Sequence, residues 1–156
     1  MPLKHGIDAS AYINIATYNS PTWSELDLFS NLTPNGGWDA AEINIRRSLV
    51  KYGAKTNLDL GFTGRMLCDD TDANYVLLRQ SWMSLTGFVD LLILDGPVTT
   101  VGSFGYRAEF QITAGGQDQP TTDVLYRDFE GVPYPTANKP KWAEVVAGPT
   151  VTFTDI

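Results

Sequence analysis

Apolar and polar residues alternate along most of this chain, which is the pattern of strands with one buried face. The alternation predicts strands over residues 7–15, 23–28, 39–47, 58–66, 104–113, 122–129 and 142–153, the last interrupted by Gly148-Pro149. Residues 88–94 are apolar apart from Asp90, which predicts a central strand covered on both faces. Tyr12 interrupts the polar face of the first strand, so we expect another part of the chain to cover it.

Residues 70–87 carry a helical pattern between these strands. Tyr75, Leu78, Trp82 and Leu85 recur at intervals of three or four residues, which places them on one helical face. Thr71 can cap the start with its hydroxyl, and Gly87 stands where a left-handed stop residue is expected. We therefore expect a helix of about four turns over residues 71–86 that packs on a sheet.

The alternating stretches 39–47 and 58–66 are predicted to pair as antiparallel strands. Residues 31–37, which contain Pro34-Asn35-Gly36-Gly37, read as a loop before the first of them. The connection of residues 48–57 is longer than a tight hairpin needs, so it predicts a projecting loop with a function or with mobility. Residues 132–140 contain three prolines and predict an irregular segment.

The length of 156 residues fits one domain over residues 1–156, with the projecting loop at 48–57. The fold class that we expect is mostly β: an antiparallel β-sandwich or open barrel of seven or eight strands with one flanking α-helix. Several of the predicted strands are nine or more residues long and therefore leave long edges. Such edges must be blunted or paired with another chain.

The composition of the chain limits the kinds of partner and the cellular compartment that we expect. Eighteen acidic and 11 basic residues give a formal net charge of −7, which argues against a surface that grips nucleic-acid phosphates. The single cysteine, Cys68, excludes an intramolecular disulfide and suggests a reducing compartment. The start of the chain lacks the core of a signal peptide, and the longest purely apolar run, Leu91 to Leu94, is far too short for a membrane span. We expect a soluble product of the cytosol with no membrane partner.

The residues that usually carry catalysis are scarce, so we expect neither an enzyme nor a bound cofactor or metal. His5 is the single histidine, and no second histidine or nearby cation supports a thiolate at Cys68. Residues 70–74 resemble the first half of a calcium loop, but Tyr75 replaces the required glycine and Ser81 the bidentate glutamate. Capping of the helix explains this acidic cluster instead.

The order of these elements resembles the major tail tube proteins of long-tailed, siphovirus-like bacteriophages. The resemblance covers the 39–47 and 58–66 pair around its loop, the helix 71–86, the strand from Leu91 to Gly96, and the run Gly105 to Phe110 that leads into Gly115-Gly116. Contractile-tail and type VI secretion tube proteins share the same fold. The resemblance lies in the order of the elements and in their pattern of apolar and polar residues along most of the chain, and not in a signature motif.

The resemblance implies a structural virion protein, a subunit of the viral tail tube. In that family six subunits close a homohexameric ring, the rings stack, and genome DNA passes through the lumen during ejection. It further implies a place in the tail of the virion, assembly in the host cytoplasm, and contact with tape-measure, tail terminator and tail tip proteins.

The resemblance also suggests which residues meet a partner. The loop would reach the adjacent ring, with Lys51, Gly53 and Lys55 in the contact. Polar residues of the paired strands, which we place on an acidic face toward the lumen, are Glu42, Asn44, Asp59 and Thr63. The alternative for this face is simple solvation.

Two further functions stay open. A tail terminator or head-to-tail connector shares the ring geometry but caps a tube instead of extending it. A small-ligand-binding β-barrel would instead be a monomer with aromatic side chains around a pocket and the helix at its flank.

Overall fold

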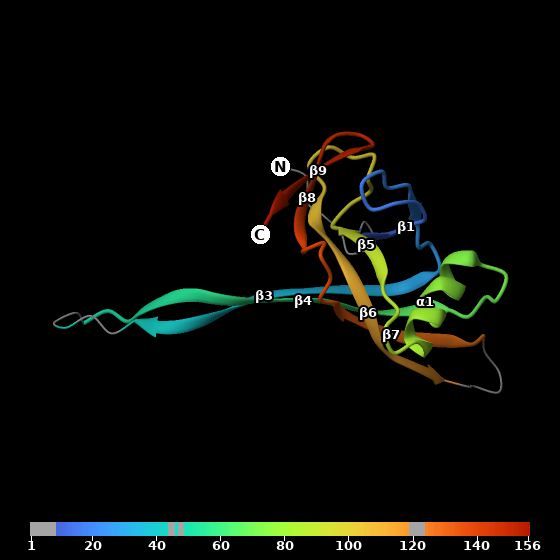
Figure 1. The fold of residues 1–156 in the computed structure, drawn as a ribbon, viewed down its shortest axis with the longest axis horizontal. Coiled ribbons are helices and arrows are strands. Elements are labelled where there is room, and N and C mark those ends of the chain that lie inside the picture. Colours follow the sequence, from blue (N-terminus) through green and yellow to red (C-terminus); the bar gives the residue numbers. More distant parts are fainter. Residues whose placement is uncertain (1–8, 44–45, 47–48, 119–123) are drawn as a thin grey trace.

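The computed structural model describes residues 9–43, 46, 49–118 and 124–156 of the chain (Figure 1). The elements in chain order are β1 (Ser10–Asn14), β2 (Trp23–Glu25), β3 (Phe29–Ile43), β4 (Tyr52–Leu67), α1 (Ala73–Met83), β5 (Val89–Leu94), β6 (Phe104–Asp118), β7 (Tyr126–Pro133), β8 (Lys141–Ala147) and β9 (Thr150–Asp155).

The strands form one antiparallel sheet that curls into a half-barrel. The main path of the sheet runs β2-β1-β5-β6-β7-β4-β3, and β8 pairs with the start of β6 and with β9. The expected mostly β, antiparallel architecture with one helix is confirmed. The described part of the chain has nine strands instead of seven or eight, because residues 142–153 turn back at Gly148-Pro149 and give both β8 and β9.

Two apolar clusters lie on the two faces of this sheet. The larger one packs Phe62, Phe110 and Phe129 against Tyr75 and Leu78 of α1, and the rings of Phe62 and Phe110 meet edge to face at 5.3 Å. The helix therefore covers one face of the sheet, as expected.

The smaller cluster includes Tyr12, Leu92 and Val145, so β5 is buried on both faces, as predicted. Tyr12 is 6% exposed, and its hydroxyl accepts a hydrogen bond of 3.0 Å from the Val98 N–H. This contact satisfies the polar tip of a tyrosine that faces the core.

The helix is shorter than the pattern predicted. Asp72, and not Thr71, is the N-cap: its carboxylate accepts hydrogen bonds from the backbone N–H groups of Asn74 and Tyr75 at 2.8 and 3.1 Å. The helix ends at Met83, and among the described glycines Gly102, not Gly87, has a positive φ. Tertiary pairing sets this end, because the chain must leave the helix to start β5 at Val89, opposite Phe110.

Three strand boundaries also differ from the expectation. Residues 31–37, predicted as a loop, lie inside β3, which is an edge strand and so tolerates Pro34. β6 runs past its predicted end at residue 113 and continues through Gly115 to Asp118. A Cβ at residue 115 would lie 2.7 Å from the Trp82 ring, so the glycine makes room for the helix and does not end the strand. β7 starts at Tyr126 and runs to Pro133, past the predicted end at residue 129.

Candidate functional site

The long free edge of β3 is the first feature that bears on function. β3 has 15 residues, stands at the end of the strand path and pairs with β4 alone among the described strands. The opposite end of the path is β2, which has only three residues. A long edge strand offers a row of backbone donors and acceptors to another chain. The fold therefore has one extended surface suited to strand pairing between subunits.

Next to this edge lies a face of polar side chains, on the side of the sheet away from α1. The register places Thr33 opposite Thr63, Thr63 opposite Glu130, and Arg65 opposite Asp128. We call this surface the polar face; its residues are Asn31, Thr33, Asp59, Thr63, Arg65, Asp128 and Glu130. The core residues Phe62, Met66 and Phe129 alternate with these and point toward the helix.

The polar face is acidic. It holds three carboxylates, from Asp59, Asp128 and Glu130, and one cation, Arg65. The Arg65 Nε lies 3.0 Å from an Asp128 carboxylate oxygen, and both side chains are about half exposed, so water screens the pair. A net negative charge remains on the surface after this pair is counted.

The residues predicted for a lumen face do not share one surface. Asp59 and Thr63 lie on the polar face, whereas Asn44 lies outside the described residues. Glu42 pairs with Gly53, and since side chains alternate along β3 from Thr33, Glu42 lies on the other side of the strand. Asp128 and Glu130 were not predicted for this face, because only the β4–β7 pairing brings them beside Thr63.

The β3–β4 hairpin continues beyond the body of the sheet as an arm, which we define as residues 38–43 and 49–58 (Figure 1). The predicted loop at 48–57 is wrong in its extent, because β4 starts at Tyr52; Ser48 lies outside the described residues. Lys51 is exposed near the arm tip, and Gly53 sits in β4. The Lys55 Nζ lies 5.3 Å from the centre of the Trp38 ring, so this lysine packs along the arm.

An apolar groove opens at the base of the arm, with a volume of about 320 Å³. Its lining comes from the arm base, from β5 and β6, and from β8: Pro34, Gly36, Gly37, Trp38, Leu58, Leu60, Ile93, Leu94, Asp95, Phe104, Gly105, Tyr106 and Trp142. The Phe104 and Trp142 rings stack at 5.8 Å. We call this surface the aromatic groove. The helix contributes none of its lining residues, unlike the pocket expected of a ligand-binding barrel.

Tyr106 closes the inner end of the aromatic groove. Its hydroxyl donates to the Gly61 carbonyl and lies 3.3 Å from the Asn35 carbonyl oxygen, which ties β6 to the base of the arm. Burial raises the pKa of this phenol to about 12. The arm base is therefore anchored to the core through a neutral tyrosine.

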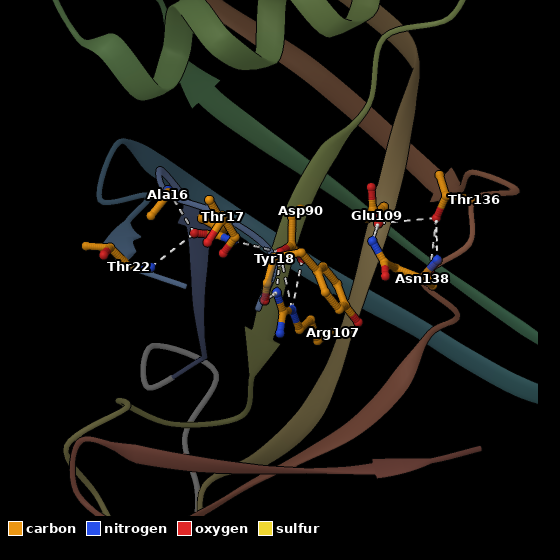
Figure 2. Close-up of polar contacts among 10 residues, drawn as sticks. Ala16, Thr17, Tyr18, Thr22, Asp90, Arg107, Glu109, Thr136 and Asn138 are labelled. Atoms are coloured by element: carbon orange, nitrogen blue, oxygen red, sulfur yellow. Dashed lines mark hydrogen bonds and ion pairs between the residues drawn. The ribbon is translucent and has the colours of Figure 1, made fainter. Parts of the chain in front are cut away.

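A buried ion pair joins Arg107 of β6 to Asp90 of the neighbouring strand β5 (Figure 2). Arg107, 4% exposed, donates to both Asp90 oxygens and to the Tyr18 carbonyl, with Nη2 at 2.6 Å from the carboxylate and 2.8 Å from the carbonyl. The guanidinium also lies 3.8 Å from the Tyr18 ring centre. Asn14 donates to Asp90 at 3.0 Å and accepts from the N–H groups of Ala16 and Thr22. The cluster fixes the β1–β2 connection against the sheet.

Glu109 is the second buried carboxylate of this region (Figure 2). It accepts hydrogen bonds from the Asn138 amide at 2.7 Å and the Thr136 hydroxyl at 3.2 Å. The Glu109 carbonyl accepts from the Tyr134 N–H at 2.7 Å. These contacts hold the irregular segment after β7 in place, and a structural role accounts for the whole cluster.

The residues that could support catalysis or metal binding do not form a site in the described part of the chain. His5 lies outside the described residues, and Cys68 is half-buried with the Gln117 amide nitrogen 3.8 Å from its sulfur. Residues 9–43, 46, 49–118 and 124–156 contain no group of three side chains that could hold a metal. Asp69 accepts from the N–H and hydroxyl of Thr71, and these hydrogen bonds lower the pKa of its carboxyl. The acidic cluster thus orders the start of the helix.

Within the described ranges no helix has the length and apolar character that a membrane span needs.

Comparison with known proteins gives matches in three-dimensional structure alone. No protein-family model matches the chain, and no curated protein matches it. A chain in the "virion of native gene transfer agent (GTA) particle" is similar over 97% of this chain and 99% of its own, with a TM-score of 0.65 and 9% identity. A chain in the "tail of empty GTA particle", refined with C6 symmetry, gives a TM-score of 0.66 at 9% identity, with the same coverage of both chains.

A third chain belongs to the baseplate of the anti-feeding prophage (AFP), 6-fold symmetrised. It covers 93% of this chain and 97% of its own, with a TM-score of 0.59 and 7% identity. At these identities the similarity shows the fold. The expected tail-tube-like fold, shared with contractile-tail systems, is confirmed at that level.

Proposed function

We propose that the chain is a structural subunit of a phage-like tail tube and has no catalytic activity. The observation that carries the proposal is the similarity over nearly the full length of both chains to components of assembled tail and baseplate particles. The long free edge of β3 supports it, since such an edge offers unpaired backbone donors and acceptors to a neighbouring copy. The subunit would then reside in the tail of a virion or virion-like particle that is assembled in the host cytoplasm.

In this proposal six copies close a ring and the rings stack into a tube. Ring closure pairs the β3 edge of one copy with a neighbour, which removes the exposed backbone groups from solvent. The arm projects from the body of its own subunit (Figure 1) and would be the part that meets an adjacent ring. Tape-measure, tail terminator and tail tip proteins would be the further partners.

The polar face would line the lumen. Arg65 pairs with Asp128, so the carboxylates of Asp59 and Glu130 leave the polar face with a net negative charge. This charge repels the phosphates of DNA. A repelling wall lets DNA slide through without retention. Asp59 and Thr63 keep the role expected from the sequence, joined by Asp128 and Glu130.

Electron microscopy of the purified, concentrated protein tests the proposal. Rings or hollow tubes are the expected result. Rings that never stack would point to a terminator or connector that caps a tube. A compact monomer at every concentration and salt condition would contradict the proposal and would favour a ligand-binding barrel.

A pair of charge variants tests the lumen assignment. Tubes of D59K/E130K are expected to retain linear double-stranded DNA that passes through wild-type tubes, because two carboxylates of the polar face become cations. The matched control D70K/D155K changes the same charge at two exposed positions, one beside the start of α1 and one at the end of β9. Equal retention by both variants would remove the polar face from the lumen.

A further inference from the structure

The arm leaves the sheet at a defined point. β4 pairs with β7 from Phe62 to Leu67, whereas residues 52–61 of β4 pair with β3 alone among the described strands. From Gly61 outward the hairpin is therefore a two-stranded ribbon without a third strand beside it (Figure 1). Such a ribbon is only marginally stable in water. Its direction relative to the body must depend on contacts at its base.

Contacts within the arm join its two strands to each other. The Lys55 Nζ lies 5.3 Å from the centre of the Trp38 ring, and the Thr56 hydroxyl donates to the Asp39 carbonyl at 3.2 Å. Both contacts cross from β4 to β3 and neither reaches the body. The arm is therefore held together internally and can move as one lever.

Two consecutive glycines of β3, Gly36 and Gly37, stand directly before the arm. Both are exposed, and a Cβ at residue 37 would meet no atom within 4 Å, so close packing does not require a glycine there. Glycine inside a strand leaves the backbone freer than any other residue. These two positions are where the ribbon can bend.

One side chain of the body reaches both strands at this point. The Tyr106 hydroxyl donates to the Gly61 carbonyl and lies 3.3 Å from the Asn35 carbonyl oxygen. Asn35 and Gly61 are partners in the β3–β4 register, so the hydroxyl spans the ribbon where it leaves the sheet. Residue 106 itself is paired on both sides, with Ile93 of β5 and Trp142 of β8. The donor is thus presented by a strand inside the sheet.

The other contacts at the base are apolar. Leu60 belongs to the larger core cluster, and Leu58 packs against it. Apolar packing has no preferred direction, whereas a hydrogen bond weakens steeply when its angle changes. The two leucines therefore hold the base near the body, and the Tyr106 hydroxyl restricts the direction in which the arm points.

We propose that the Tyr106 hydroxyl is a latch that fixes the direction of the arm, and that Gly36 and Gly37 form the hinge about which the arm swings when the latch opens. The proposal concerns the single chain and does not depend on the proposed tail-tube function. The ten residues from Gly61 to Lys51 make a lever of about 33 Å, so a swing of about 20° moves the end of the arm by about 11 Å. A displacement of this size is measurable.

Single-molecule fluorescence energy transfer in a Cys68→Ala background tests the latch. One dye is attached at Lys51→Cys near the end of the arm and the other at Glu144→Cys, an exposed position of β8. Picomolar concentration keeps every chain alone. With Tyr106 intact we expect one narrow population of transfer efficiency. Tyr106→Phe should broaden this population or add a second one, because the ring stays and only the donor is lost.

Tyr12→Phe is the matched control. Tyr12 is 6% exposed, as is Tyr106, and its hydroxyl also bonds to a backbone group, the Val98 N–H, within the smaller apolar cluster. This variant should keep the narrow population. Gly37→Val added to Tyr106→Phe should narrow the distribution again, because a β-branched side chain stiffens an extended strand and the space at residue 37 is open.

A broad distribution with Tyr106 intact, an unchanged one in Tyr106→Phe, or equal broadening in Tyr12→Phe would overturn the latch. A double variant that stays broad would overturn the hinge at the two glycines. If circular dichroism shows that Tyr106→Phe has lost its fold, Gly61→Ala takes its place and should broaden the distribution. A Cβ at residue 61 would lie 2.9 Å from the Gly131 carbonyl oxygen and must displace the acceptor of the latch.

The latch and the tail-tube proposal can fail separately. If the purified chain never forms rings or tubes, the tail-tube proposal falls, and the single-chain measurement still decides on the latch. If tubes form while Tyr106→Phe leaves the transfer distribution unchanged, the latch is wrong and the tail-tube proposal stands.

Discussion

Replacement of Arg107 by methionine should strongly destabilise the fold, because it leaves the buried carboxylate of Asp90 without its cationic partner. Asp90 is 12% exposed in its side chain and would keep only the Asn14 amide as a partner. Removal of one member of a buried, hydrogen-bonded pair costs about 3–5 kcal/mol. The Tyr18 carbonyl also loses its donor, so the β1–β2 connection should loosen.

Urea unfolding measured by tryptophan fluorescence is the assay. The Trp23 ring lies 5.0 Å from the guanidinium and reports on the site directly. The control is Arg79→Met, whose partner Asp70 is 76% exposed, so its loss should be below about 1 kcal/mol.

The double variant R107M/D90L removes both charges and should recover most of the stability that Arg107→Met loses. This recovery distinguishes the cost of an unpaired Asp90 carboxylate from the cost of lost packing around the Arg107 side chain. A loss below about 1 kcal/mol for Arg107→Met, or no recovery in the double variant, would refute the reasoning.

Three smaller perturbations follow from the same structure. Gly131→Ala would place a Cβ 2.2 Å from the Phe62 ring and should cost about 1–3 kcal/mol in a thermal melt, whereas Gly116→Ala has open space and should change stability by less than about 0.5 kcal/mol. Because the pKa of Tyr106 is about 12 when folded and 10.0 ordinarily, its share of stability is complete below pH 10 and is lost as the pH rises to 12; Tyr106→Phe should flatten an alkaline unfolding curve in that window. Asp72→Ala should lose about 1 kcal/mol and some helical circular dichroism, since the N-cap acceptor disappears; an unchanged signal would contradict the cap assignment.

The alternation of apolar and polar residues was enough to predict the mostly β fold, the central position of β5 and the burial of Tyr12. These properties depend on local pattern, because a side chain on a strand has only two faces to choose from. The helix was likewise predicted from its spacing. Its exact end was not, since Met83 is followed by a turn that serves the start of β5 at Val89.

The sequence misjudged segments whose neighbours override local preference. Residues 31–37 look like a loop because they contain Pro34 and two glycines, yet the long partner β4 extends β3 through them. The same effect converted most of the predicted loop at 48–57 into the paired arm. Local propensity is weak compared with a continuous ladder of backbone hydrogen bonds.

Which residues share a surface depends on how the strands pair, and this could not be predicted from the sequence. The pairing of β4 with β7 brings Asp128 and Glu130 beside Thr63, and the run of the β3–β4 pair places Glu42 on the other side of the arm. The aromatic groove gathers Trp38, Phe104 and Trp142 from three strands far apart in the chain. Strand order and register are set by long-range contacts, and no local pattern encodes them.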